Sequence, residues 1–92
     1  MKKSALDAFI ERYNSGDLVG CDVTYCGYIF QYTGNFWGYV WKTGENGREN
    51  PDTEHEYGWN SFEEFLDDTM TEVGATFREI LAAVPVEEAL FD

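Results

Sequence analysis

The residues that could carry chemistry are a single histidine, two cysteines and eighteen carboxylates. His55 stands among the acids of a polar segment, but a zinc site needs four fixed ligands. The chain has no CxxC or HxxxH spacing that would bring Cys21 or Cys26 to it. It also lacks HExxH, GxSxG and a phosphate-binding glycine loop. We therefore expect no metal, no cofactor and no enzyme activity, and a pair of His55 with one cysteine is the alternative that catalysis would require.

The carboxylates are distributed unevenly along the chain. Residues 1–42 hold four acids and four bases, whereas residues 43–92 hold fourteen acids against Arg48 and Arg78, so the net charge of −12 lies in the second half. Such a field repels nucleic acid and anionic membranes, and it attracts basic surfaces. We therefore expect a basic protein as partner, with no direct binding of nucleic acid and no membrane association.

Two groups of acids form the predicted partner-binding surface, one on the solvent face of a predicted helix and one in a polar loop. On a helix, residues four apart are separated by about 6 Å of rise, which aligns carboxylates in rows. The predicted partner-binding residues are Glu63, Glu64, Asp67, Asp68, Glu72, Glu45, Glu49, Asp52, Glu54 and Glu56. Crowding should raise the pKa of these carboxyl groups. A solvated, solubilising face is the alternative interpretation.

The first element that the sequence predicts is a helix. Ser4 followed by Asp7 resembles a capping box, and apolar residues recur at helical spacing as far as Tyr13. Asn14, Ser15 and Gly16 favour the end of a helix. We expect a helix over residues 5–13.

Residues 23–42 hold eight of the sixteen aromatic side chains and read as strands. A two-residue turn at Gly34-Asn35 would pair Tyr32 with Trp37 and place six aromatic rings on one face. Residues 21–33 form either one long strand or two strands that reverse at Cys26-Gly27, and we favour the second, with Val23 opposite Phe30. Such a face is either core or a protein-binding surface.

A long polar segment and a long helix follow the strands. Residues 43–58 contain few apolar residues and read as a loop, either functional or a disordered connector. Ser61 with Glu64 forms a second capping-box pattern, after which apolar residues keep a period of 3.6 up to Val84. The pattern predicts one helix of about 23 residues, bent or broken near Gly74. Pro85 ends it.

These elements predict a single α+β domain over residues 1–92, with an N-terminal helix, an antiparallel β-hairpin or three-stranded meander, and a long C-terminal helix packed on the sheet. Asp7 and Glu11 interrupt the N-terminal apolar residues, so we expect no signal peptide. If Cys21 and Cys26 share one strand, their spacing of five places them on opposite faces, which disfavours a disulfide. These features suggest the cytoplasm.

The size, the helix–sheet–helix order and the acidic, aromatic run from Tyr57 to Met70 resemble small acidic inhibitor proteins of phages and mobile elements. The resemblance is to anti-CRISPR and anti-restriction proteins that mimic nucleic acid. It implies stoichiometric inhibition, without a cofactor, of a basic nucleic-acid-binding protein such as a CRISPR effector or restriction nuclease. The alternative is an adaptor domain that binds through its aromatic sheet face, an interpretation that allows a homodimer.

Overall fold

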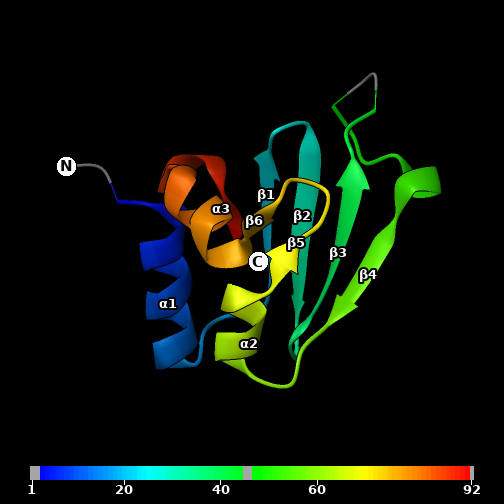
Figure 1. Ribbon diagram of the computed structural model, residues 1–92. Coiled ribbons are helices and arrows are strands. Elements are labelled where there is room, and N and C mark those ends of the chain that lie inside the picture. The colour runs from blue at the N-terminus through cyan, green and yellow to red at the C-terminus, as the bar shows by residue number, and fades with distance from the viewer. Residues whose placement is uncertain (1–2, 45–46, 92) are drawn as a thin grey trace.

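All three α-helices lie on the same side of a five-stranded antiparallel sheet (Figure 1). The computed structural model describes residues 3–44 and 47–91. The strand order is β4-β3-β2-β1-β7. The strands are β1 Cys21–Tyr25, β2 Tyr28–Gly34, β3 Trp37–Lys42, β4 His55–Gly58 and β7 Leu90–Phe91. The helices are α1 Ala5–Ser15, α2 Phe62–Asp67 and α3 Phe77–Ala83, and the predicted α+β class is confirmed.

The N-terminal helix is confirmed, and its ends follow from local chemistry. The Ser4 hydroxyl accepts from the Asp7 N–H at 3.2 Å, and the Asp7 carboxylate accepts from the Ser4 N–H at 3.3 Å, which completes the capping box of α1. Gly16 closes the helix in the left-handed conformation at φ 80°. Phe9 is fully buried and contacts Tyr32 of β2, so the apolar stripe of α1 faces the sheet.

The sheet has more strands than the sequence predicted. The chain reverses at Cys26-Gly27, where both φ angles are positive, and Val23 pairs with Phe30 as expected. Two further strands, β4 and β7, flank the predicted three. The segment 43–58 is therefore not a loop throughout, since it contains the 3₁₀ helix η1 Pro51–Thr53 as well as β4.

The predicted register of the β2–β3 hairpin is wrong by one residue. The turn is formed by Asn35 and Phe36, both left-handed at φ 54° and 58°, and a bulge separates the pairs Tyr32–Gly38 and Gly34–Trp37. The strained Phe36 is held at both ends, because its N–H donates to the Tyr32 hydroxyl at 3.2 Å and its carbonyl accepts from the Trp59 N–H at 2.8 Å.

The shift divides the aromatic residues between two faces of the sheet, because one residue of slip exchanges the faces of a strand. Phe30 and Tyr32 point at the helices together with Val40, and all three are buried in the core. The aromatic side chains of β3, which are Trp37, Tyr39 and Trp41, lie on the outer face. The predicted face of six rings does not form.

The predicted long C-terminal helix is also wrong. It is replaced by α2, a two-stranded hairpin of β5 Thr69–Met70 and β6 Ala75–Thr76, and α3. Asp68 leaves the helix with ψ 134°, and the next residues include β-branched Thr69, Thr71 and Val73, which have low helix propensity. Gly74 turns the hairpin at φ 67°. The 3.6 period survives because Met70, although in a strand, is fully buried.

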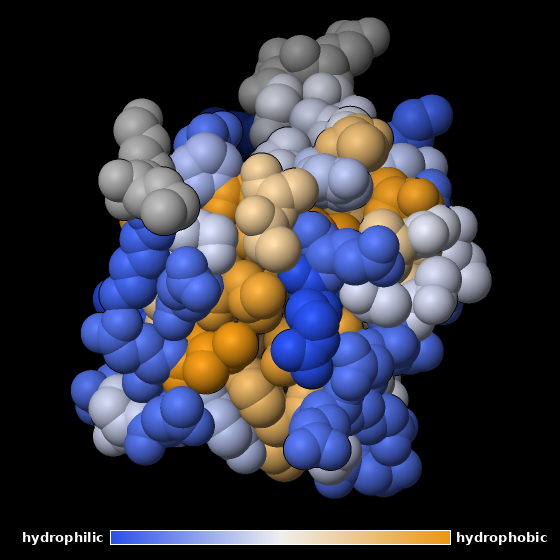
Figure 2. Space-filling model, turned by 60° about the vertical axis from the view of Figure 1, so that its left-hand side comes forward, coloured by the Kyte–Doolittle hydropathy of each residue, from blue (hydrophilic) through white to orange (hydrophobic). Residues whose placement is uncertain are grey.

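Beyond α3 the chain continues through Pro85 into the 3₁₀ helix η2 Val86–Glu88 and then β7. The N–H of Ala5 donates to the Val84 carbonyl at 2.7 Å and the N–H of Val86 to the Lys3 carbonyl at 3.1 Å, so the start of α1 is tied to this segment. Figure 2 shows the helix-bearing side, where hydrophobic residues gather in the middle between hydrophilic margins. No helix in the described part of the chain has the length and apolar character needed to cross a membrane.

Candidate functional site

The edge strand β4 positions several polar contacts of the acidic half. It pairs with β3 so that His55 and Tyr57 lie opposite Val40 and Gly38, which places both side chains on the helix side of the sheet. Because side chains alternate along a strand, Glu56 lies on the outer face. Trp59 follows β4 on the helix side and is 7% exposed.

On the outer face, two tryptophans hold two carboxylates. The Trp37 indole N–H donates to Glu56 Oε2 at 3.0 Å, and the Trp41 indole N–H donates to Glu54 Oε1 at 3.0 Å. Tyr39 stacks on Trp41 with ring centroids 5.5 Å apart. Trp41 is only 8% exposed although none of the described α-helices covers this face, whereas Trp37 is 43% exposed.

On the helix side, the residues of β4 and Trp59 hold two more carboxylates, both from the segment that was predicted to be helical. The Trp59 indole N–H donates to Asp68 Oδ2 at 3.0 Å. The Tyr57 hydroxyl donates to Glu72 Oε1 at 2.7 Å, and His55 Nδ1 lies 2.9 Å from Glu72 Oε2. The three rings are themselves in contact, with centroids 4.2 Å apart for His55–Tyr57 and 5.9 Å for Tyr57–Trp59.

We call the four carboxylates along β4 the acidic rim; they are Glu54, Glu56, Asp68 and Glu72. An indole or a phenol donates a hydrogen bond without bringing a positive charge. These donors therefore fix the position of a carboxylate while its negative charge remains. The rim is therefore a pre-positioned array of negative charge.

Crowding was expected to raise the pKa values of these carboxyl groups, but those of Glu72 and Asp67 are lowered. Partial burial acts to raise the pKa of Glu72, but the hydrogen bonds from Tyr57 and His55 outweigh it, and the pKa is lowered from its ordinary value. The hydrogen bond from Arg78 lowers the pKa of Asp67. Burial raises the pKa of Tyr57, and its neighbour Glu72 adds to this, so the phenol stays a donor at neutral pH.

Acidification should therefore destabilise the protein through Glu72. Its folded pKa is depressed, so the stabilisation is present above the unfolded pKa and is lost as pH falls through the folded value. Urea unfolding followed by circular dichroism at about pH 7 and about pH 3 measures this, with Glu72→Gln as the control that cannot titrate. The loss of stability on acidification should be larger for wild type than for the variant. An equal or smaller loss in wild type would contradict the lowered pKa.

Four of the ten predicted partner-binding residues, those of the rim, are held by aromatic donors beside β4, two on each face of the sheet. The structure does not extend the array along α2, because Arg78 pairs with Asp67 at 2.9 Å. Glu63 and Glu64 are exposed on α2, whose start is set by Ser61 accepting from the Glu64 N–H at 3.1 Å.

The remaining predicted residues lie in the segment before β4. Glu49 forms an isolated bridge with Thr43, Asp52 lies in η1, and both acids are exposed. Glu45 lies outside the described residues. Glu49 and Asp52 are therefore not part of the rim.

Sequence reasoning missed the aromatic donors that hold the rim. From the sequence, Trp37 and Trp41 are expected in the core or in a protein contact and Tyr57 in a loop, and no acid partner is predicted for them or for Trp59. The alternation of His55, Tyr57 and Trp59 was a period-two signal for a strand inside the polar segment. Its pairing partner could not be deduced from that signal.

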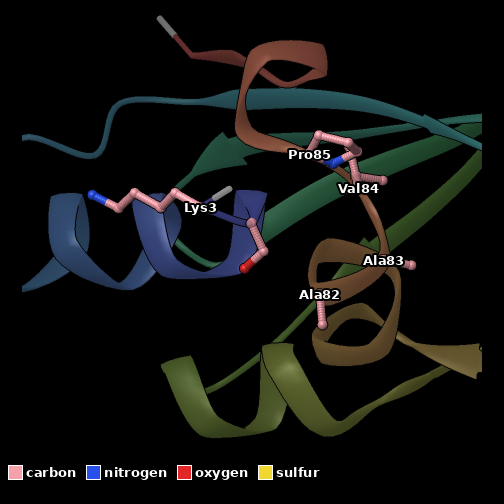
Figure 3. A pocket seen from close by; sticks show the side chains of 6 residues that line it. Lys3, Ala82, Ala83, Val84 and Pro85 are labelled. Carbon is pink, nitrogen blue, oxygen red and sulfur yellow. The ribbon is translucent and has the colours of Figure 1, made fainter. Parts of the chain in front are cut away.

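Among residues 3–44 and 47–91, no three His, Cys, Asp or Glu side chains are grouped as a metal site requires. A hollow of about 190 Å³ between the start of α1 and the end of α3 is lined by Lys3, Ser4 and residues 82–85 (Figure 3). It is smaller than the roughly 300–1,000 Å³ of typical ligand sites, and its lining is mainly apolar.

Comparison of the chain with protein-family models, curated proteins and solved structures gave no match.

Proposed function

We propose that this protein is a stoichiometric, non-enzymatic inhibitor that uses the acidic rim to bind a basic nucleic-acid-binding protein. One observation carries the proposal. Glu54, Glu56 and Asp68 belong to the half of the chain with the surplus negative charge, and each accepts a hydrogen bond at 3.0 Å from a neutral indole N–H. Carboxylates fixed in this way would occupy sites that the partner uses for phosphates. A CRISPR effector or restriction nuclease is the class of partner that fits.

The rim suits arginine and lysine for two physical reasons. Fixed side chains lose less conformational entropy on binding than mobile ones, so more of the electrostatic attraction appears as affinity. The exposed ring of Trp37 lies directly beside Glu56, and an aromatic face next to a carboxylate can contact a guanidinium through both its charge and its plane. This surface replaces the helix rows that the sequence predicted.

A second candidate function is supported by the uncovered face of the sheet. Trp37 on β3 is 43% exposed, and Leu90 on the edge strand β7 is 68% exposed. Aromatic residues on such a face serve as anchors in protein interfaces. An adaptor that binds through this face should show a weak dependence on salt.

The two candidates are separated by charge-neutralising variants that keep the hydrogen bonds. Glu54→Gln with Glu56→Gln retains an oxygen that can accept from each indole but removes two charges. Affinity for purified CRISPR effector and restriction nucleases should fall about tenfold or more, which corresponds to about 1.4 kcal/mol or more. Wild-type binding should also weaken as salt rises and should compete with the DNA of the nuclease.

The matched control is Glu87→Gln with Glu88→Gln, which makes the same change in net charge on η2. η2 leads into β7, the strand at the opposite edge of the sheet from β4. The control should bind like wild type. Equal loss in both variants would indicate a net-charge effect without a rim, and no loss in either would favour the aromatic face.

A further inference from the structure

β4 leaves one backbone edge open. Within the described residues the five-stranded sheet ends at β4, and Figure 1 shows no element beyond it. The N–H of Trp59 donates to the Phe36 carbonyl across the β3–β4 pair at 2.8 Å. Bonded and non-bonded pairs alternate in an antiparallel ladder, so the N–H and C=O groups of Glu56 and Gly58 point away from β3.

Carboxylates flank this open edge on both faces of the sheet. Glu56 is held on the outer face by Trp37, and Glu72 is held on the helix side by Tyr57. A strand laid along β4 would direct its side chains alternately to these two faces. Basic side chains would therefore find a carboxylate on either face.

The same charges oppose pairing between two copies of this chain. If two β4 edges came together, Glu54 and Glu56 of one copy would lie close to the same residues of the other. Like charges on adjacent strands are destabilising, and charged side chains are a common protection of edge strands. The open edge of β4 should therefore pair with a basic strand more readily than with β4 of a second copy.

We propose that β4 accepts an extended basic segment of the partner protein as an additional strand, with arginine or lysine recognised by Glu56 and Glu72. This inference deepens the proposed function and rests on it for the choice of a protein partner. Backbone hydrogen bonds to Glu56 and Gly58 supply the register, and the carboxylates supply the preference for basic side chains.

The test uses a synthetic peptide of about eight residues in which pairs of arginine alternate with pairs of valine, because adjacent residues of a strand point to opposite faces and each pair can then reach Glu56 and Glu72. The matched control has the same side chains but carries N-methyl groups on the backbone nitrogens that would face β4. The unmodified peptide should slow hydrogen exchange at the N–H groups of Glu56 and Gly58. It should also bind about tenfold or more tightly than the N-methylated peptide.

The outcomes distinguish the binding mode from the proposed function. Equal affinity of the two peptides, or absence of protection at Glu56 and Gly58, would overturn strand addition. If nucleases are still bound and inhibited in that case, the proposed function stands without it. Protection by the unmodified peptide, with no binding of any nuclease, would support the strand site and reject the proposed inhibitor.

Discussion

Replacing Phe65 with Ala should lower the free energy of unfolding by about 3–5 kcal/mol, a large share of the 5–15 kcal/mol typical of a domain. Phe65 is fully buried, and its ring is the centre of the core. Ring centroids lie 4.6 Å away for Phe77, 4.7 Å for Tyr32 and 4.9 Å for Trp59. Truncation would leave a cavity that faces both the sheet and α3, which neither side can fill by a small shift.

Urea unfolding monitored by circular dichroism measures this loss. Phe65→Leu is the control, because it keeps most of the apolar volume and should lose less stability. If Phe65→Ala unfolds at the same denaturant concentration as wild type, the core is not organised around this ring. Phe77→Ala, at a side chain 2% exposed, should behave like Phe65→Ala.

Replacing Trp59 with Ala should cost a similar amount, about 3–5 kcal/mol. Its ring meets Phe65 and Phe77 edge-on, at 4.9 Å and 6.1 Å between centroids, and covers Gly38 in β3. A Cβ at Gly38 would come within 2.5 Å of the Gln31 carbonyl oxygen and 3.2 Å of the Trp59 ring, so a larger residue does not fit at this position of β3. The change also removes the donor to Asp68.

Trp37→Ala is the matched control, because it removes the same side chain and a similar indole–carboxylate hydrogen bond. Trp37 is 43% exposed, against 7% for Trp59, so its loss should cost only about 1 kcal/mol. Denaturant midpoints of the two variants give the comparison. Equal costs would mean that the indole hydrogen bonds, and not the burial, dominate the stability of these positions.

Local signals were enough to predict α1 and the β1–β2 hairpin. Ser4, Asp7 and Gly16 act within one turn of α1, and Cys26-Gly27 supplies the two positive φ angles of a tight hairpin. Each depends on neighbouring residues alone. Such features can be read from the chain before any tertiary contact is known.

The hairpin register could not be predicted in this way. Gly34-Asn35 and Asn35-Phe36 differ by one residue, and glycine made the first the better turn by local chemistry. The observed choice places Gly38 under the ring of Trp59, which lies twenty-one residues further along the chain. A tertiary contact decides the register, and with it the face on which three aromatic residues lie.

The long helix was predicted because the apolar residues keep a helical period up to Val84 without interruption. The backbone nevertheless leaves the helical conformation between α2 and α3. A signal against it was present, since Thr76 with Glu79 is a further capping-box pattern inside the supposed helix. Both of its hydrogen bonds form, at 3.0 Å and 3.1 Å, and they begin α3. The excess of acids in this region could be predicted from the sequence. The aromatic donors that hold them could not, because the contacts of Trp37 and Trp41 depend on the pairing of β3 with β4.

Because the indoles are hydrogen-bonded to carboxylates of the rim, intrinsic tryptophan fluorescence should report binding at the rim. The chain has three tryptophans, and each indole N–H donates to a carboxylate of the acidic rim. Fluorescence of these residues depends on the charges and dipoles around the ring. A basic partner that docks on the rim would therefore change the tryptophan emission spectrum directly. Binding can then be titrated without attaching a dye. Replacement of Trp37 alone assigns the contribution of that residue.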